Sequence, residues 1–191
     1  MQLDKLKILM IGPCDSGKTM LANFLSDCIN TEEAGVPKPT QGVRIVEFEM
    51  TSLNVNDKQY KVDIEMWDCS GDHKFESCWP ALRLGVHGVI LVYSSNTANI
   101  ASKEMELLYN YFVSQAKLST KQCVLFYNSL NDQDDLDSLN LYIFINMDLS
   151  LFTAPTFSKV SQTAVNLKTG GNRLKIDFSN FVTSILHTLN K

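Results

Sequence analysis

One eight-residue stretch constrains this chain more than any other: Gly12-Pro13-Cys14-Asp15-Ser16-Gly17-Lys18-Thr19. It has the form G-x-x-x-x-G-K-[ST] and directly follows an apolar run from Leu6 to Ile11. Apolar residues recur at helical spacing behind it: Met20, Leu21, Phe24, Leu25 and Cys28. A strand, a glycine-bounded loop and a helix form the context that a phosphate-binding loop requires.

The residue types of this loop indicate its chemistry. Gly12 and Gly17 permit backbone conformations that a β-carbon would strain, so the loop can turn its N–H groups inward around phosphate oxygens. We expect Lys18 to place a point charge on the outer phosphates and the Thr19 hydroxyl to ligate Mg²⁺. The rest of the loop would cradle the nucleotide: Pro13, Cys14, Asp15, Ser16 and Gly17. The alternative is a chance glycine-rich turn with an exposed lysine.

A second motif follows the predicted strand from Tyr60 to Trp67. It reads Asp68-Cys69-Ser70-Gly71, a carboxylate just past a buried strand and three residues before a glycine. We expect Asp68 to hold Mg²⁺, directly or through water, and the Gly71 N–H to reach a γ-phosphate. The alternative is a strand-ending turn capped by Asp68.

Strand and helix patterns alternate along much of the chain. They predict the α/β class, with a single doubly wound, mostly parallel sheet and one antiparallel edge strand in one domain over residues 1–191. The edge strand lies between Val43 and Met50 and forms a hairpin with the strand that ends at Trp67. We expect Phe157 to Val160 to form the last strand, before a closing helix. Residues 141–149 fit either a strand or a short helix.

Charge and termini limit the choice of partners. The net charge is −4 and the chain has no run of Lys or Arg, so we expect no binding to nucleic acid or to anionic membranes. Met1-Gln2 at the start and the lack of a cysteine among the last residues argue against a direct lipid anchor. The five cysteines form no C-x-x-C pair and read as reduced thiols of a cytoplasmic protein.

Taken together, these residues make the chain resemble Ras-superfamily small GTPases, and within them the Rab-like GTPases of intraflagellar transport complex B. The resemblance covers roughly the first half of the chain. It rests on the form that the loop takes here, Gly12-Pro13-Cys14 with Ser16-Gly17-Lys18-Thr19, and on four further segments: Leu21-Ala22-Asn23-Phe24-Leu25, Pro39-Thr40-Gln41-Gly42-Val43-Arg44, Trp67-Asp68-Cys69 and Lys74 to Leu82. It implies the small-GTPase fold, with GTP or GDP and Mg²⁺ as ligands.

The resemblance also implies roles for two loops. Thr40 becomes the switch-one threonine, whose hydroxyl completes the Mg²⁺ shell and whose N–H senses the γ-phosphate. Residues 68–82 become switch two, and both loops would be ordered by the triphosphate and released without it. The alternative for Thr40 is a turn threonine after Pro39.

Two departures from the superfamily bear on catalysis. Cys14 replaces the usual glycine, and its side chain intrudes where an attacking water would sit. Asp72 stands at the position of the water-orienting glutamine, and a short carboxylate beside a γ-phosphate repels it. We therefore expect very slow intrinsic hydrolysis.

The guanine-reading motif is degenerate as well. Where the superfamily has N-K-x-D, this chain has Asn128-Ser129-Leu130-Asn131, and Asp132 comes one place late. Asn128 and Asn131 remain candidates for base contacts, and Ser161 is the nearest counterpart of the later S-A-K loop. Loss of a bidentate carboxylate contact weakens selection for guanine.

The leading hypothesis is a nucleotide-binding adaptor with little turnover, monomeric when isolated. The resemblance implies a peripheral subunit of complex B that docks on its coiled-coil 74/81 pair, at the cilium or flagellum and its base. Phe75 and Trp79 are candidate docking residues, although either could instead belong to the core. An actively cycling switch and a degenerate fold used only for docking remain alternatives. A phosphate-loop kinase is disfavoured because the three arginines, Arg44, Arg83 and Arg173, are widely separated.

Overall fold

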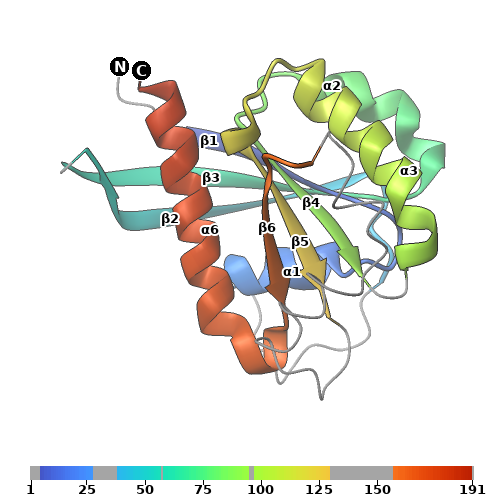
Figure 1. Ribbon diagram of the computed structural model, residues 1–191, viewed down its shortest axis with the longest axis horizontal. Coiled ribbons are helices and arrows are strands. Elements are labelled where there is room, and N and C mark those ends of the chain that lie inside the picture. Colours follow the sequence, from blue (N-terminus) through green and yellow to red (C-terminus); the bar gives the residue numbers. More distant parts are fainter. Residues whose placement is uncertain (1–4, 28–37, 57, 95–96, 130–156, 191) are drawn as a thin grey trace.

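Buried strands with apolar residues on both faces predict a sheet covered on both sides, and the computed structural model has this arrangement (Figure 1). It describes residues 5–27, 38–56, 58–94, 97–129 and 157–190. Within them lies a six-stranded sheet of order β2-β3-β1-β4-β5-β6. Its strands are β1 Lys5–Ile11, β2 Val43–Val55, β3 Lys58–Cys69, β4 Gly88–Ser94, β5 Cys123–Asn128 and β6 Ser161–Val165.

Helices cover both faces of this sheet. On one face lie α1 (Lys18–Leu25) and α6 (Leu167–Leu189), and on the other lie α2 (Trp79–Arg83) and α3 (Ala98–Tyr109) (Figure 1). Shorter turns of helix complete the described chain: η1 His73–Cys78, η3 Asn110–Ser114, which is a π-helix, and η4 Thr120–Gln122. None of the described helices is both long enough and apolar enough to cross a membrane.

The central strand β1 contributes to two separate cores. Leu6, Ile8 and Met10 belong to the core under α1 and α6, whereas Leu9 and Ile11 belong to the core under α2 and α3. Because successive side chains of a strand point to opposite faces, one apolar run supplies both layers. β1 runs parallel to β3 and β4, which places its carboxyl end, and the loop that follows, between theirs.

The predicted hairpin is confirmed. β2 pairs antiparallel with β3 and lies at the edge of the sheet, while the other pairings are parallel. The register sets Arg44 directly opposite Asp68. This pairing brings the start of β2 to the end of β3, beside the loop after β1.

The last strand differs from the prediction. Residues 157–160 form a turn, and β6 instead begins at Ser161. Only Ala164 and Val165 of β6 are buried, so its apolar signal is weaker than that of Phe157 and Val160. Parallel pairing with β5 supplies the backbone hydrogen bonds that make the more polar segment the strand. The ambiguous stretch 141–149 lies outside the described residues.

Candidate functional site

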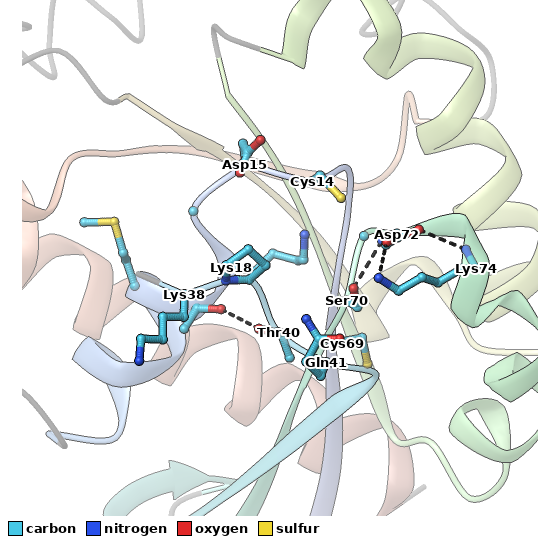
Figure 2. Close-up of a pocket in the computed structure, with 15 residues that line it drawn as sticks. Cys14, Asp15, Lys18, Lys38, Thr40, Gln41, Cys69, Ser70, Asp72 and Lys74 are labelled. Atoms are coloured by element: carbon cyan, nitrogen blue, oxygen red, sulfur yellow. Dashed lines mark hydrogen bonds and ion pairs between the residues drawn. The ribbon is translucent and has the colours of Figure 1, made fainter. Parts of the chain in front are cut away.

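The glycine-bounded loop lies between β1 and α1, at the carboxyl end of the parallel strands. Gly17 immediately precedes α1 with φ of 86°, a left-handed conformation that favours glycine. Beside the loop is a pocket of about 680 Å³, with Lys18, Lys38, Thr40 and Lys74 among the residues around it (Figure 2). A ligand of nucleotide size therefore has room at the positive end of a helix.

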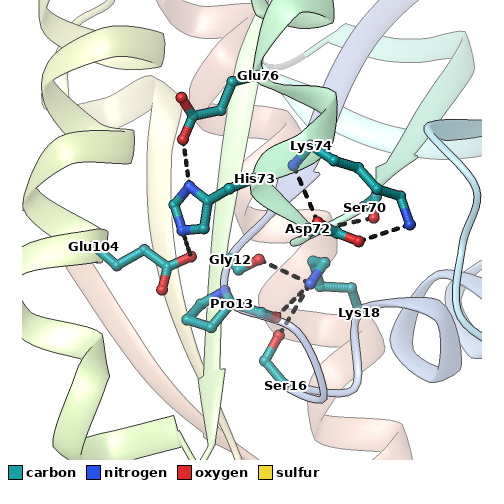
Figure 3. A network of polar contacts seen from close by, with 10 residues as sticks. All are labelled: Gly12, Pro13, Ser16, Lys18, Ser70, Asp72, His73, Lys74, Glu76 and Glu104. Atoms are coloured by element: carbon teal, nitrogen blue, oxygen red, sulfur yellow. Dashed lines mark hydrogen bonds and ion pairs between the residues drawn. The ribbon is translucent and has the colours of Figure 1, made fainter.

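Lys18 is nearly buried, with 6% of its surface exposed. Its Nζ donates to the carbonyl oxygens of Gly12 at 2.9 Å and Pro13 at 2.6 Å, so the ammonium group lies within the curve of the loop (Figure 3). Burial lowers the pKa of Lys18, and the charge of Asp68 opposes that shift. The geometry places this cation where phosphate oxygens would enter the loop.

Three oxygen-bearing side chains meet where α1, the start of β2 and the end of β3 come together. The Thr19 hydroxyl donates to Asp68 Oδ2 at 2.8 Å and lies 2.9 Å from the Thr40 hydroxyl. Thr40 Oγ1, whose residue is labelled in Figure 2, is itself 3.4 Å from Asp68 Oδ2.

The carboxylate in this cluster is fully buried. Burial raises the pKa of Asp68, while the hydrogen bond from Thr19 and the charge of Arg44 oppose the shift. Its second oxygen, Oδ1, is buried and lacks a hydrogen-bond partner among the described residues. Hydroxyl and carboxylate oxygens are the ligands that Mg²⁺ prefers, and an unsatisfied buried oxygen suits a cation or its bound water. The residues present therefore fit the metal that the sequence predicts.

Gly71 lies against the backbone of the loop. A β-carbon at this position would approach the Cys14 nitrogen, the Pro13 carbonyl carbon at 2.5 Å and the Gly12 oxygen at 2.6 Å. Because those contacts are with backbone atoms, no neighbouring side chain could make room for a β-carbon by changing its rotamer. The two segments that the sequence assigned to phosphate binding are thus in direct contact.

Asp72 does not project freely towards the pocket. Its Oδ1 accepts from the Lys74 N–H at 3.0 Å and caps η1, and its Oδ2 lies 2.7 Å from Lys74 Nζ (Figures 2 and 3). These interactions lower the pKa of Asp72. The carboxylate is held by its own segment, which differs from the expectation of an unpaired charge facing a phosphate.

The residues assigned to base recognition are only partly brought together. Asn128 ends β5, is buried, and donates its Nδ2 to the Ser16 carbonyl at 3.1 Å, so it braces the loop. Ser161 begins β6 opposite Val124, at the far end of the strand from Asn128, and is not brought to the loop. Asn131 lies outside the described residues.

The remaining loop and switch-two candidates are placed as follows. Cys14 and Asp15 are exposed at the tip of the loop, whereas Ser16 is buried. Partial desolvation of the thiol raises the pKa of Cys14, and the charge of Lys18 opposes that shift. Trp79 packs on Tyr111 and Phe112, with ring centroids 5.2 and 5.3 Å away. It belongs largely to the core under α3.

Arg44, which no sequence motif assigns to the site, also lies beside the cluster. Its Nη2 lies 3.4 Å from Asp68 Oδ2. The signal was present in the strand pattern: Val46, Phe48 and Met50 alternate on the core-facing side of β2, and Arg44 occupies the next position of that same alternation. A charge at an otherwise apolar position calls for a buried counter-charge.

Comparison with known proteins agrees with this geometry. The family model described as "Ras of Complex, Roc, domain of DAPkinase" matches residues 7–131. The intraflagellar transport protein 22 homolog of Homo sapiens is 38% identical over 188 residues, which cover 98% of this chain and 93% of that protein. The homolog of Danio rerio is 50% identical over 115 residues, 60% of each chain.

Two solved structures share the fold. The GDP-bound T. brucei IFT22 crystal structure matches with a TM-score of 0.66 and 19% identity, over 96% of this chain and 97% of that one. The GTP-bound T. brucei IFT22/74/81 crystal structure matches with a TM-score of 0.68 and 22% identity, over 97% and 96%. With the family match and the full-length relatives, the chain belongs to the intraflagellar transport protein 22 family of Ras-like small GTPases.

Proposed function

We propose that this chain binds GTP and GDP with Mg²⁺, hydrolyses GTP very slowly, and acts as a peripheral adaptor subunit of intraflagellar transport complex B. All 191 residues would serve as one nucleotide-binding domain. The observation that supports this best is the cluster in which the Thr19 and Thr40 hydroxyls contact Asp68 Oδ2, next to a buried loop lysine, while the buried Oδ1 of the same carboxylate lacks a partner among the described residues. A chance glycine-rich turn would have no reason to assemble hydroxyls from two separate segments beside a buried acid on a third.

In this proposal each member of the site has one task. Mg²⁺, when bound with the nucleotide, neutralises phosphate charge; Thr19 and Thr40 would ligate it, and Asp68 would hold it directly or through water. Lys18 and the N–H groups of the loop would bind the phosphates. Thr40 lies in the segment that precedes β2, so its position would report whether the triphosphate is present.

Slow hydrolysis follows from what the site lacks. Catalysis by small GTPases requires a group that orients the attacking water. Asp72 occupies that position, but its carboxylate caps η1 and pairs with Lys74. Cys14 adds a side chain at the loop position where the superfamily has glycine. In this proposal neither residue would orient a water molecule towards a phosphate.

The partner is proposed from the relatives. The T. brucei structure with 74/81 is GTP-bound, and a fold match over 97% of this chain supports a similar assembly. We propose that this chain docks on the coiled-coil 74/81 pair at the cilium or flagellum and its base. Molecules of this chain that are not docked on the pair would lie in the cytoplasm.

A binding experiment with the purified 74/81 pair tests the whole proposal. The chain is loaded with GTP, with GDP or with no nucleotide, and the captured fraction is compared with that of Lys18→Ala. We expect the 74/81 pair to capture the GTP-loaded chain. The Kd for the pair should be at least about tenfold weaker for nucleotide-free Lys18→Ala, because removing a ligand that orders the docking surface causes a loss of about this size. Equal capture of all forms would contradict a nucleotide-dependent adaptor and favour a fold used for docking alone.

A further inference from the structure

Arg44 places a positive charge at the candidate metal site from the opposite strand. It is directly across from Asp68 in the β2–β3 pairing, and its Nη2 lies 3.4 Å from Asp68 Oδ2. Cross-strand neighbours in an antiparallel pair are held at a fixed separation by the ladder, so the closeness does not depend on a flexible loop (Figure 1 shows the two strands side by side).

The environment of the pair makes its charge important. Asp68 is fully buried, and the Nε and Nη2 atoms of Arg44 are shielded from water without a hydrogen-bond partner in the part of the chain that the structure describes. A buried carboxylate is costly unless a counter-charge is close. Lys18, the other cation near this carboxylate, directs its ammonium to the carbonyls of Gly12 and Pro13. Arg44 is therefore the cation in contact with Asp68.

A divalent metal and a guanidinium group would act on the same carboxylate. Each neutralises Asp68, and each reduces the repulsion between that carboxylate and incoming phosphates. They would also repel one another, because both are positive and a metal held by Asp68 would share that carboxylate with the guanidinium. A site in which a guanidinium group already neutralises the carboxylate therefore binds the metal more weakly, and nucleotide binding there depends less on the metal.

We propose that Arg44 is a built-in counter-cation of this site, which neutralises Asp68 and competes with Mg²⁺ for it, so that nucleotide binding depends only weakly on Mg²⁺. This inference rests on the proposed nucleotide function. Its consequence is regulatory: the chain keeps its nucleotide when Mg²⁺ is scarce, and the metal exerts little control over nucleotide release.

The test measures Kd for GTP and for GDP, once with Mg²⁺ and once in EDTA, in the wild-type chain and in Arg44→Gln. For the wild type we expect removal of Mg²⁺ to weaken nucleotide binding by less than about tenfold. For Arg44→Gln we expect the loss to be at least about tenfold larger, since the buried carboxylate then has no counter-ion. The Mg²⁺ concentration at which half of the gain in nucleotide affinity is reached should fall in Arg44→Gln, because the competing cation is gone.

Two variants separate charge from structure. Arg44→Lys keeps the charge, so its dependence on Mg²⁺ should stay near that of the wild type even if Arg44→Gln proves unstable. Lys61→Gln removes one exposed positive charge from the same hairpin, at its ion pair with Glu49, and should behave as the wild type. A large Mg²⁺ dependence in Arg44→Lys would overturn the counter-cation role.

The outcomes distinguish this inference from the function on which it rests. If the wild type binds nucleotide and Arg44→Gln shows the same ratio of Kd values in EDTA and in Mg²⁺, Arg44 is not a counter-cation and the proposed function stands. If the wild type binds no nucleotide in either condition, both proposals fall.

Discussion

The carboxylate of Asp72 lies 2.7 Å from the ammonium group of Lys74, two residues further along the same segment. The same carboxylate accepts the Lys74 N–H, so both of its oxygens are engaged within η1. We infer from this pairing that the carboxylate of Asp72 takes little part in orienting water.

Replacement of Asp72 should therefore change hydrolysis little. We expect the single-turnover rate with GTP to lie below about 10⁻⁴ s⁻¹, slower than the roughly 3–5 × 10⁻⁴ s⁻¹ of a small GTPase without a helper protein, and Asp72→Ala to stay within about threefold of it. Asp72→Gln should raise the rate, since an amide restores the water-orienting group. A large loss of rate in Asp72→Ala would show that the carboxylate takes part in catalysis.

Gly71→Ala should destabilise the protein because the new β-carbon would meet the backbone of the loop at Gly12 and Pro13. Overpacking of this kind costs about 1–3 kcal/mol. Thermal unfolding of the nucleotide-free chain should show a lower Tm than the wild type by about 2–4 °C per kcal/mol. Ser77→Ala, at an exposed position of η1, is the control. An unchanged Tm would mean that switch two does not rest on the loop in solution.

His73 links switch two to α3 in a pH-dependent way. Its Nδ1 is bonded to Glu76 and its Nε2 lies 3.7 Å from Glu104 (Figure 3). The bond to Glu76 raises the pKa of His73 above its usual value, near 6.5, with a further contribution from the charge of Glu104.

A folded-state pKa above the unfolded value means that this stabilisation is complete below the unfolded pKa and is lost as pH rises through the folded pKa. We expect the Tm difference between wild type and His73→Gln to be larger at pH 6 than at pH 9. Because the side chains of His73 and Glu76 are exposed to solvent, this difference in Tm should be small. A difference that grows with pH would contradict the ion-pair geometry.

Asn128 should support the loop more than it reads a base. Its Nδ2 donates to the buried Ser16 carbonyl, and loss of a buried hydrogen bond costs about 1–3 kcal/mol. Asn128→Ala should lower the Tm and weaken the binding of GTP and of GDP by similar factors, while ATP still fails to compete. Asn190→Ala, at an exposed position, should change neither the Tm nor the nucleotide affinity. Competition by ATP that appears in Asn128→Ala would instead assign Asn128 to base recognition.

Much of this fold and site could be predicted from local patterns. The loop from Gly12 to Thr19 and the end of β3 at Asp68 are short motifs whose context lies within a few residues. The hairpin follows from alternation and a turn signal. Such features depend on contacts near in sequence, which propensity and periodicity report directly.

What could not be predicted depends on register and packing. The pairing of Arg44 with Asp68 requires knowing which residues of two strands lie opposite one another, and the alternation alone leaves this open. The engagement of Asp72 by Lys74 depends on the turn that forms η1. Ser161 was aligned through a region without a motif, and its place at the start of β6 follows only from the pairing with β5.

A fluorescent-nucleotide titration in Mg²⁺, competed by GTP, GDP and ATP, tests nucleotide binding at this site, with Lys18→Ala as the control. We expect GTP and GDP to compete, ATP not to compete, and Lys18→Ala to bind no nucleotide. Equal competition by all three would contradict the guanine assignment. No binding by the wild-type chain would contradict the central claim that this loop and the Thr19–Thr40–Asp68 cluster form a nucleotide site.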